Sequence, residues 1–381
     1  MKIGIVVPHI FMQRDILPHV IFSPAQLALD LAKGIHALGA DVTLLTPGPV
    51  DTPVRNVTAD LSLFEQELGG RGDTYIDLLK KHPMTFVTLA RQVQAELIAK
   101  AYAMANSGEL DVVHIYTNEE DIALPFAALC TKPVVFTHHD PFNFLVKYKS
   151  VFPKYKQLHW ISMSLAQRKG MPADTNWAGN IYHGVRDDLL QPNYNPAGGY
   201  VAYLGRIIEP KGVHLAIAAA KEYNRTAATP LVLKIAGKHY AGAKDAYWQE
   251  RILSEIDGKT IIYEGFINNR VAKQMFIGNA RALLVPSLFE EPFGMVAIEA
   301  LACGTPVIGL DSGALPEIIQ QGETGYIVAK SANEQRTIAG LASIIDRAMA
   351  LDRHACRAGF LSRFTTARMC SEHLSLYKSI L

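Results

Sequence analysis

Two glutamates and a glycine in one short segment form the clearest chemical pattern of the sequence. Glu291 lies before Gly294, and Glu299 follows inside the apolar run 295–302. An unpaired carboxylate in such a run would be costly, whereas a carboxylate can accept hydrogen bonds from two neighbouring hydroxyls. We therefore expect these carboxylates to bind ligand hydroxyls. The alternative is that Glu290 and Glu291 offset a helix dipole while Glu299 is solvated.

The same segment predicts a helix N-terminus suited to a phosphate. A strand is expected to end at Val285, and a helix is expected to begin near Gly294 after a loop. The free backbone amides of Gly294, Met295 and Val296 would point out of that helix, which favours an anion. Gly294 has no Cβ, so a ligand can approach its backbone closely.

A second segment adds two cations. Gly205 and Arg206 follow the strand expected at 200–204, and Lys211 opens the next helix. An arginine can hold a phosphate with two hydrogen bonds, and a lysine adds a point charge. The alternatives are a salt bridge from Arg206 to Glu209 and a solvated Lys211. Together with the glutamate segment, these cations favour a diphosphate site.

The elements that position these residues alternate between strands and helices. This rhythm predicts parallel sheets with helices on both faces. A stretch rich in proline, glycine and asparagine at 191–199 predicts a linker. We expect domains at 1–192 and 193–364, and a C-terminal helix at 365–381 that could pack back on the first domain. Strands are expected at 2–7, 41–46, 112–116, 134–137, 160–162, 200–204, 231–236, 260–263, 282–285 and 306–310.

Composition excludes several classes of protein. The 37 basic and 36 acidic residues of the 381-residue chain give a formal charge of +1, which argues against a nucleic-acid binder. The four cysteines show no metal-ligand spacing, so we expect no zinc site, no disulfide and a cytoplasmic location. We expect no signal peptide and no membrane-spanning helix. No Gly-x-Gly-x-x-Gly follows an expected strand, which disfavours a nicotinamide-binding enzyme.

In this order and spacing the motifs resemble those of the family 4 glycosyltransferases, retaining enzymes of the GT-B fold. The resemblance covers nearly the whole chain and is strongest from residue 200 to residue 328. The matching residues are Gly205-Arg206 with Lys211-Gly212, 235–237, 263–266, Pro286-Ser287, the pair Glu291 and Glu299, 299–308, Gly313, 317–319, Gly322 and Gly325.

The resemblance implies an α/β fold of two Rossmann-like doubly wound domains that face each other across a cleft, with 1–192 on the acceptor side and 193–364 on the donor side. It implies a nucleotide-sugar donor, with a UDP-sugar favoured over a GDP-sugar. Arg206 and Lys211 would hold the diphosphate, Glu299 the ribose, and Glu291 would face the donor sugar. The implied catalytic residues are His139, Arg206, Lys211 and Glu291, and the implied donor-binding residues are Gly205, Gly265, Phe266, Ile267, Phe293, Gly294, Met295, Val296 and Glu299.

The first half of the chain matches the family less well. By position, His139 corresponds to the family histidine that contacts the donor sugar, and His138 is the alternate, which we place on the acceptor side. The other interpretation is a loop histidine bonded locally, for example by Asp140. Phe22-Ser23 stands where the family has a Gly-Gly pair, so Ser23 is expected on the acceptor side within an acceptor loop formed by 8–23.

The resemblance and the residues also set expectations for mechanism and partners. The chain has no Asp-x-Asp triplet, so we expect no metal cofactor, with the cations in the metal's place. The acceptor is an unknown sugar, lipid-linked or small molecule. The basic, aromatic segment 147–160 could make a weak peripheral membrane contact, although a solvated helix face is favoured. Alternatives for the function are a nucleotide-sugar epimerase of the GT-B fold and a non-catalytic nucleotide-sugar-binding protein.

Overall fold

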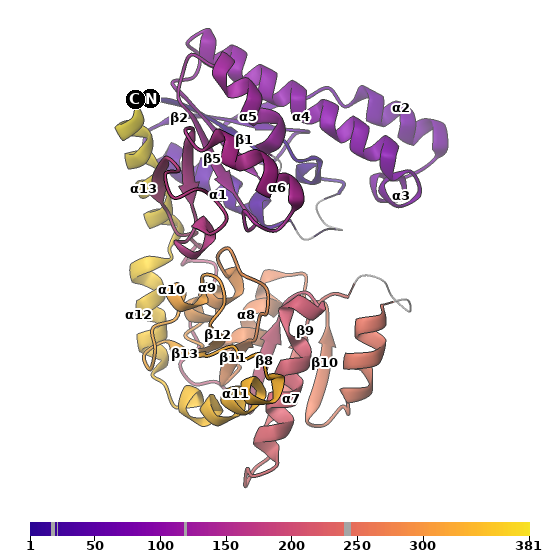
Figure 1. Cartoon of the computed structure of the whole chain (residues 1–381), viewed down its shortest axis with the longest axis vertical. Coiled ribbons are helices and arrows are strands. Elements are labelled where there is room, and N and C mark those ends of the chain that lie inside the picture. Colours follow the sequence, from indigo (N-terminus) through magenta and orange to yellow (C-terminus); the bar gives the residue numbers. More distant parts are fainter. Residues whose placement is uncertain (17–19, 21, 118–119, 240–244) are drawn as a thin grey trace. The chain divides into compact units, whose positions relative to one another are not determined.

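The chain divides into two compact units, each with its own parallel sheet. The computed structural model describes all residues except 17–19, 21, 118–119 and 240–244 (Figure 1). Met1–Tyr182 and Thr366–Leu381 form the first unit, and His183–Thr365 form the second. The expectation of a cleft between two facing domains stays a prediction.

The first unit has a seven-stranded parallel sheet in the order β3-β2-β1-β4-β5-β6-β7. Its central strands are buried along nearly their whole length, as expected for a parallel sheet covered by helices. The strands are β1 (Lys2–Val6), β2 (Asp41–Thr46), β3 (Arg55–Thr58), β4 (Val112–Thr117), β5 (Val134–His138), β6 (His159–Ser162) and β7 (Trp177–Asn180). The helices are α1 (Ser23–Ala37), α2 (Ser62–Arg71), α3 (Tyr75–Lys81), α4 (Pro83–Asn106), α5 (Ala123–Phe126), α6 (Val146–Val151) and α13 (Thr366–Ile380).

The second unit has a six-stranded parallel sheet in the order β10-β9-β8-β11-β12-β13. Its core joins the buried faces of these strands to those of α7 and α11. The strands are β8 (Tyr200–Leu204), β9 (Val232–Ala236), β10 (Ile261–Gly265), β11 (Ala282–Val285), β12 (Val307–Leu310) and β13 (Gly325–Val328). The helices are α7 (Val213–Asn224), α8 (Arg270–Gly278), α9 (Met295–Ala302), α10 (Leu315–Ile318), α11 (Glu334–Met349) and α12 (Arg353–Arg363).

The C-terminal helix α13 belongs to the first unit, where it packs on α1 (Figure 1). Gly34 on α1 permits this approach, because a Cβ there would lie 2.3 Å from Cys370 Sγ. The division between the units falls after Tyr182, earlier in the chain than the expected boundary at residue 192. The buried guanidinium of Arg357 donates to the carbonyls of Asp187 and Leu190, and so ties this stretch to the second unit.

The strand orders place the ligand-binding edge of each sheet. In both sheets the order reverses between two neighbouring strands, β1 and β4 in the first unit and β8 and β11 in the second. In doubly wound sheets, ligands bind beyond the carboxyl ends of the strands at such a reversal.

The strands expected at 41–46, 200–204 and 282–285 match β2, β8 and β11, whereas β3, β7 and β13 were not expected. In the part of the chain that the structure describes, no helix is long and apolar enough to cross a membrane.

Candidate functional site

The loops 205–212 and 286–294 leave the carboxyl ends of β8 and β11, the neighbouring strands at which the order reverses. The carbonyl of Pro210 accepts hydrogen bonds from the amides of Leu288 and Phe289, both at 2.9 Å. Gly212 has φ +71°, and a Cβ there would lie 1.9 Å from the carbonyl oxygen of Pro286. The backbone therefore joins the two predicted segments into one site and requires a glycine where they meet.

The cations of this site lie in different environments. Lys211 Nζ lies 2.5 Å from Glu291 Oε1, and the Oγ of Ser287 donates to the same oxygen at 2.8 Å. Both partners of the ion pair are mostly buried. Arg206 is exposed, and no described residue pairs with its guanidinium, so the alternative salt bridge to Glu209 does not form.

A buried tyrosine, which the sequence analysis missed, holds the cation loop. The hydroxyl of Tyr203 donates to the carbonyl of Arg206 at 3.0 Å and approaches that of Lys211 at 3.5 Å. Its ring is 2% exposed at the end of β8. The strand thus fixes the backbone of both cationic residues through one side chain.

The N-terminus of α9 has the form that the sequence predicts. Gly294 is the N-cap residue with φ +120°, and no side chain caps the helix. Within the described residues, the amides of Met295 and Val296 have no acceptor, since the first turn of a helix leaves such groups unpaired. Phe293 is 2% exposed, and its ring packs on Phe364 and His183, so this side chain positions the loop.

Glu299 has an ionic partner that the sequence analysis did not identify. Its Oε1 lies 2.8 Å from Nζ of Lys273 on α8. The glutamate side chain is 16% exposed and that of the lysine 32%. The cost of a carboxylate in the apolar run is therefore reduced by this ion pair. Lys273 is 26 positions away from Glu299 in the chain, so no local motif points to it.

The loop after β10 presents an aromatic ring beside the same sheet edge. Gly265 ends the strand with φ +79°, and its carbonyl accepts from the amide of Gly237 at 2.9 Å. Phe266 is 46% exposed, with Lys238 Nζ 5.7 Å from its ring centre, and Ile267 is half-buried. An exposed ring of this kind can stack on a flat ligand.

The structure separates the two histidines at the end of β5. His138 is fully buried among the rings of Phe142, Tyr148 and Phe152, and burial lowers its pKa to about 4. A buried ring cannot reach an acceptor, so the expected acceptor-side role of His138 is not supported. His139 is half-buried and packs edge-on against Tyr116, with the ring centres 4.4 Å apart.

The loop after β1 contains aromatic side chains. The ring of His9 lies 4.5 Å from that of Phe11 and 4.7 Å from that of Phe22. Ser23 is exposed and is the first residue of α1, with Phe22 as the N-cap. Residues 17–19 and 21 of the expected acceptor loop 8–23 lie outside the described residues.

The fold is that of the GT-B class, and comparisons with known proteins find similarity to glycosyltransferases. Residues 191–358 match the family described as "Glycosyl transferases group 1". The chain is 34% identical over 176 residues to lipopolysaccharide 1,2-N-acetylglucosaminetransferase of Salmonella typhimurium, a match that covers 44% of each chain. It is 24% identical over 398 residues to phosphatidyl-myo-inositol mannosyltransferase of Mycobacterium leprae, covering 100% of this chain and 97% of that one.

Solved structures agree on the fold of the whole chain. Sucrose-phosphate synthase of Thermosynechococcus elongatus has a TM-score of 0.70 at 18% identity, covering 100% of this chain and 98% of that chain. HepE of Anabaena, solved with UDP and glucose, has a TM-score of 0.68 at 16% identity, covering 100% of both chains. The chain spans less than half the length of the first curated relatives that it matches, at 44% of the Salmonella enzyme and 38% of glycogen synthase of Mycobacterium tuberculosis.

Proposed function

We propose that the protein transfers a sugar from a nucleotide-diphosphate sugar to a hydroxyl acceptor with retention of configuration, and that the donor is a UDP-sugar. The observation that carries this proposal is the joining of two loops at the β8/β11 reversal. Their backbones are hydrogen-bonded, and they bring Arg206, Lys211 and the N-terminus of α9 to one edge of the sheet. The structures of HepE with UDP and with UDP-glucose support a nucleotide-sugar donor.

The chemistry follows from where charge develops. Breaking the sugar–phosphate bond places negative charge on the leaving diphosphate. Arg206, Lys211 and the amides of Met295 and Val296 would stabilise that charge without a metal ion. Lys211 uses one of its three N–H donors on Glu291, so its ammonium group can also donate to the diphosphate. The carboxylate of Glu291 can in addition accept a hydrogen bond from a hydroxyl of the donor sugar.

The remaining donor contacts follow from the same sheet edge. Glu299 would hold the ribose hydroxyls with the oxygen that does not bind Lys273. Phe266 and its neighbours Gly265 and Ile267 would flank the base. An oxygen of the leaving phosphate would take the proton of the acceptor hydroxyl, so no side-chain base is required. The contact of His139 with the donor sugar stays a prediction from the family resemblance.

The proposal leaves the chemical class of the acceptor undefined. The name of the Mycobacterium leprae relative makes a lipid-linked acceptor one candidate. In the first unit, Phe144 and Val146 are 53% and 78% exposed, and the neighbouring Lys149 is exposed. Apolar side chains beside a lysine are suited to a weak contact with an anionic membrane. Sedimentation with liposomes that contain anionic lipid, compared with neutral liposomes, tests this contact.

A coupled assay tests the activity. The purified chain is incubated with UDP-sugars and GDP-sugars, with and without a panel of acceptors and with a chelator. Acceptor-dependent release of UDP that persists in the chelator is expected. Interconversion of the donor sugar without an acceptor would instead indicate an epimerase, and tight donor binding without turnover would indicate a binding protein. Activity lost in the chelator and restored by magnesium or manganese would contradict the metal-independent mechanism.

A further inference from the structure

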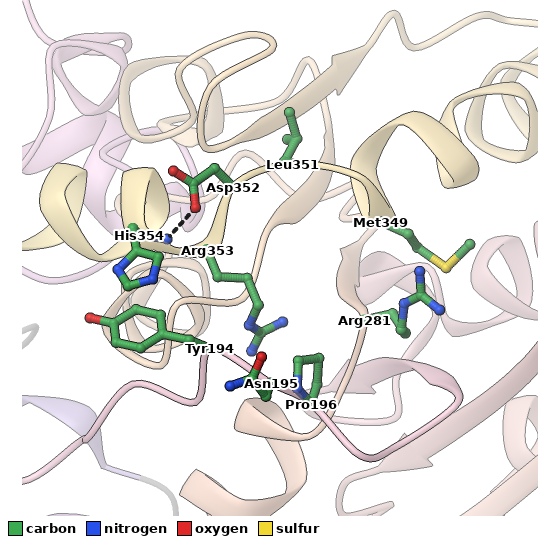
Figure 2. A pocket seen from close by; sticks show the side chains of 9 residues that line it. All are labelled: Tyr194, Asn195, Pro196, Arg281, Met349, Leu351, Asp352, Arg353 and His354. Carbon is green, nitrogen blue, oxygen red and sulfur yellow. Dashed lines mark hydrogen bonds between the residues drawn. The ribbon is translucent and has the colours of Figure 1, made fainter.

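A cavity of about 520 Å³ opens at the other edge of the second unit's sheet (Figure 2). Residues 194–196 line it and precede β8, and Arg281 lines it and directly precedes β11. The loops of the candidate donor site follow the opposite ends of the same strands. A strand of five residues spans roughly 16 Å at about 3.3 Å per residue, so the cavity is separate from that site. Its volume falls within the range of small-molecule pockets.

One wall of the cavity is a pair of stacked rings. The rings of Tyr194 and His354 lie parallel, with centres 3.7 Å apart and an angle of 12° between them. Tyr194 is 38% exposed, and His354 is exposed at the start of α12. Because the two rings cover each other's inner faces, the free surface is the outer face of the pair, and each ring holds the other in place. The apolar face of a sugar ring can pack on such a surface.

The cavity also holds positive charge that the protein does not neutralise. Arg353 is 8% exposed, and its guanidinium donates to the carbonyls of Asn193, Gly278 and Ala280 and to the hydroxyl of Thr305. No described carboxylate pairs with Arg353 or with the exposed guanidinium of Arg281. Hydrogen bonds occupy the donors of Arg353, so the exposed guanidinium of Arg281 is the group that can bind an anion.

Two further side chains can bind hydroxyls. Asp352 caps α12 by accepting the amide of His354 at 2.9 Å through Oδ1. Asp352 lies on the side of the ring pair, whereas Arg281 lies across the cavity beside Met349 (Figure 2). Asn195 also lines the cavity. Carboxylate and amide groups hydrogen-bond sugar hydroxyls, and the negative charge of Asp352 directs an anionic group to the side of Arg281.

We propose that this cavity binds an anionic sugar, with its ring on Tyr194 and His354 and its phosphate or carboxylate at Arg281. None of these residues belongs to the donor loops, so the proposal does not depend on the proposed function. A sugar held at this edge of the sheet does not compete with the donor for the same groups.

Isothermal titration of the full chain with four probes tests the ligand class. The probes are a glucose monophosphate, glucuronate, glucose and inorganic phosphate. Saturable binding of the glucose monophosphate, of glucuronate or of both is expected, at least about tenfold tighter than binding of glucose or phosphate alone. The two anionic probes distinguish a phosphate from a carboxylate. Equal binding of glucose, or no saturable binding of either anionic sugar, would overturn the proposal.

Variants locate the site. Arg281→Gln and Tyr194→Leu should each weaken binding of the anionic sugar about tenfold or more. Arg225→Gln changes an exposed arginine elsewhere in the same unit and should leave binding unchanged. Arg206→Gln, in the candidate donor site, should also leave it unchanged. Binding that survives Arg281→Gln, or that is lost in Arg206→Gln, would place the sugar elsewhere and refute the assignment.

Discussion

The two units have the same strand order around their reversal points but present different chemistry there. In the second unit, the loops after β8 and β11 are joined by backbone hydrogen bonds and contain Arg206 and Lys211. In the first unit, the loop after β1 contains the packed rings of His9, Phe11 and Phe22. The strand order indicates a candidate ligand-binding edge in each unit, and the loops at these edges differ in charge and in aromatic content.

The two units also differ in the titratable and charged side chains that they bury. The first unit buries neutral imidazoles: His114 lies between Tyr377 and Thr137, at 2.6 and 2.8 Å, and burial lowers the pKa of both His138 and His373 to about 4. The second unit buries the guanidinium groups of Arg353 and Arg357 against backbone carbonyls. A guanidinium stays charged at every ordinary pH, whereas a buried imidazole must remain neutral. Acid should therefore affect the two units differently.

The largest expected effect is a selective loss of stability of the first unit in acid. The folded-state pKa of His138 and His373 is below the unfolded value of about 6.5, so the unfolded chain binds more protons below that pH. The stabilisation present above pH 6.5 is therefore lost as the pH falls towards 4. At pH 5 the loss is about 2 kcal/mol for each of these histidines, or about 4 kcal/mol in total.

Tryptophan fluorescence during urea unfolding can assign this loss to a unit. Trp160 and Trp177 lie in the first unit and Trp248 in the second. Trp248→Phe therefore reports on the first unit, and the double variant Trp160→Phe, Trp177→Phe reports on the second. The free energy of unfolding should fall more in the first unit between pH 7 and pH 5. The second should fall less, because burial lowers the pKa of three histidines in the first unit, His114, His138 and His373, and of His214 in the second. Equal losses would contradict the comparison.

The next effect concerns the unpaired cation at the β8/β11 edge. Arg206→Ala should lower kcat by roughly 100- to 1000-fold, or about 2.7–4 kcal/mol, by analogy with the loss of one hydrogen-bond donor to a developing anion. Steady-state kinetics with the donor established by the coupled assay measure this change. Arg225→Ala removes an exposed arginine from the same unit and should leave kcat unchanged. Near-normal turnover of Arg206→Ala would mean that the edge does not stabilise the leaving group.

The sequence predicts where the candidate donor segments lie in the fold, because the residues of each segment are close together in the chain. Gly205 to Gly212 and Glu291 to Glu299 are short segments that each follow a recognisable strand, so spacing alone places them at a sheet edge. The sequence does not predict hydrogen-bond and ionic partners that depend on tertiary packing. The ion pair of Glu299 with Lys273 and the hydrogen bond from Tyr203 to the carbonyl of Arg206 form only when the helices and strands pack.

The strand pattern around His138 contained information that the sequence analysis did not use. Side chains alternate between the faces of a strand, and Val134 and Phe136 of β5 point into the aromatic core of the first unit. His138 follows in the same alternation and is buried with them, whereas His139, one residue beyond the strand, is half-buried. The period of the strand therefore distinguishes the two histidines. The boundary after Tyr182 had no such signal, because it depends on hydrogen bonds from Arg357.

A smaller effect is expected at the partner of Glu299. Lys273→Met removes the charge that orients the carboxylate, so the KM for the donor should rise about tenfold while kcat stays within about twofold. Lys273→Arg should restore most of the affinity. Lys221→Met breaks an exposed ion pair with Glu255 in the same unit and should leave the KM for the donor unchanged. A fall in kcat instead of a rise in KM would place Glu299 at the reacting atoms rather than at the ribose.

The smallest effect tests the aromatic edge of the first unit. Phe22→Ala removes a ring that packs on His9, and an aromatic contact contributes about 0.5–1.5 kcal/mol. The KM for the acceptor should therefore rise about two- to tenfold, while the KM for the donor stays unchanged. Phe22 is 9% exposed, so Phe64→Ala, which removes another buried ring of this unit, is the matched control, and urea unfolding checks that each variant is folded. A rise in the KM for the donor without a rise in the KM for the acceptor would contradict this comparison. The aromatic loop after β1 would then belong to the donor site.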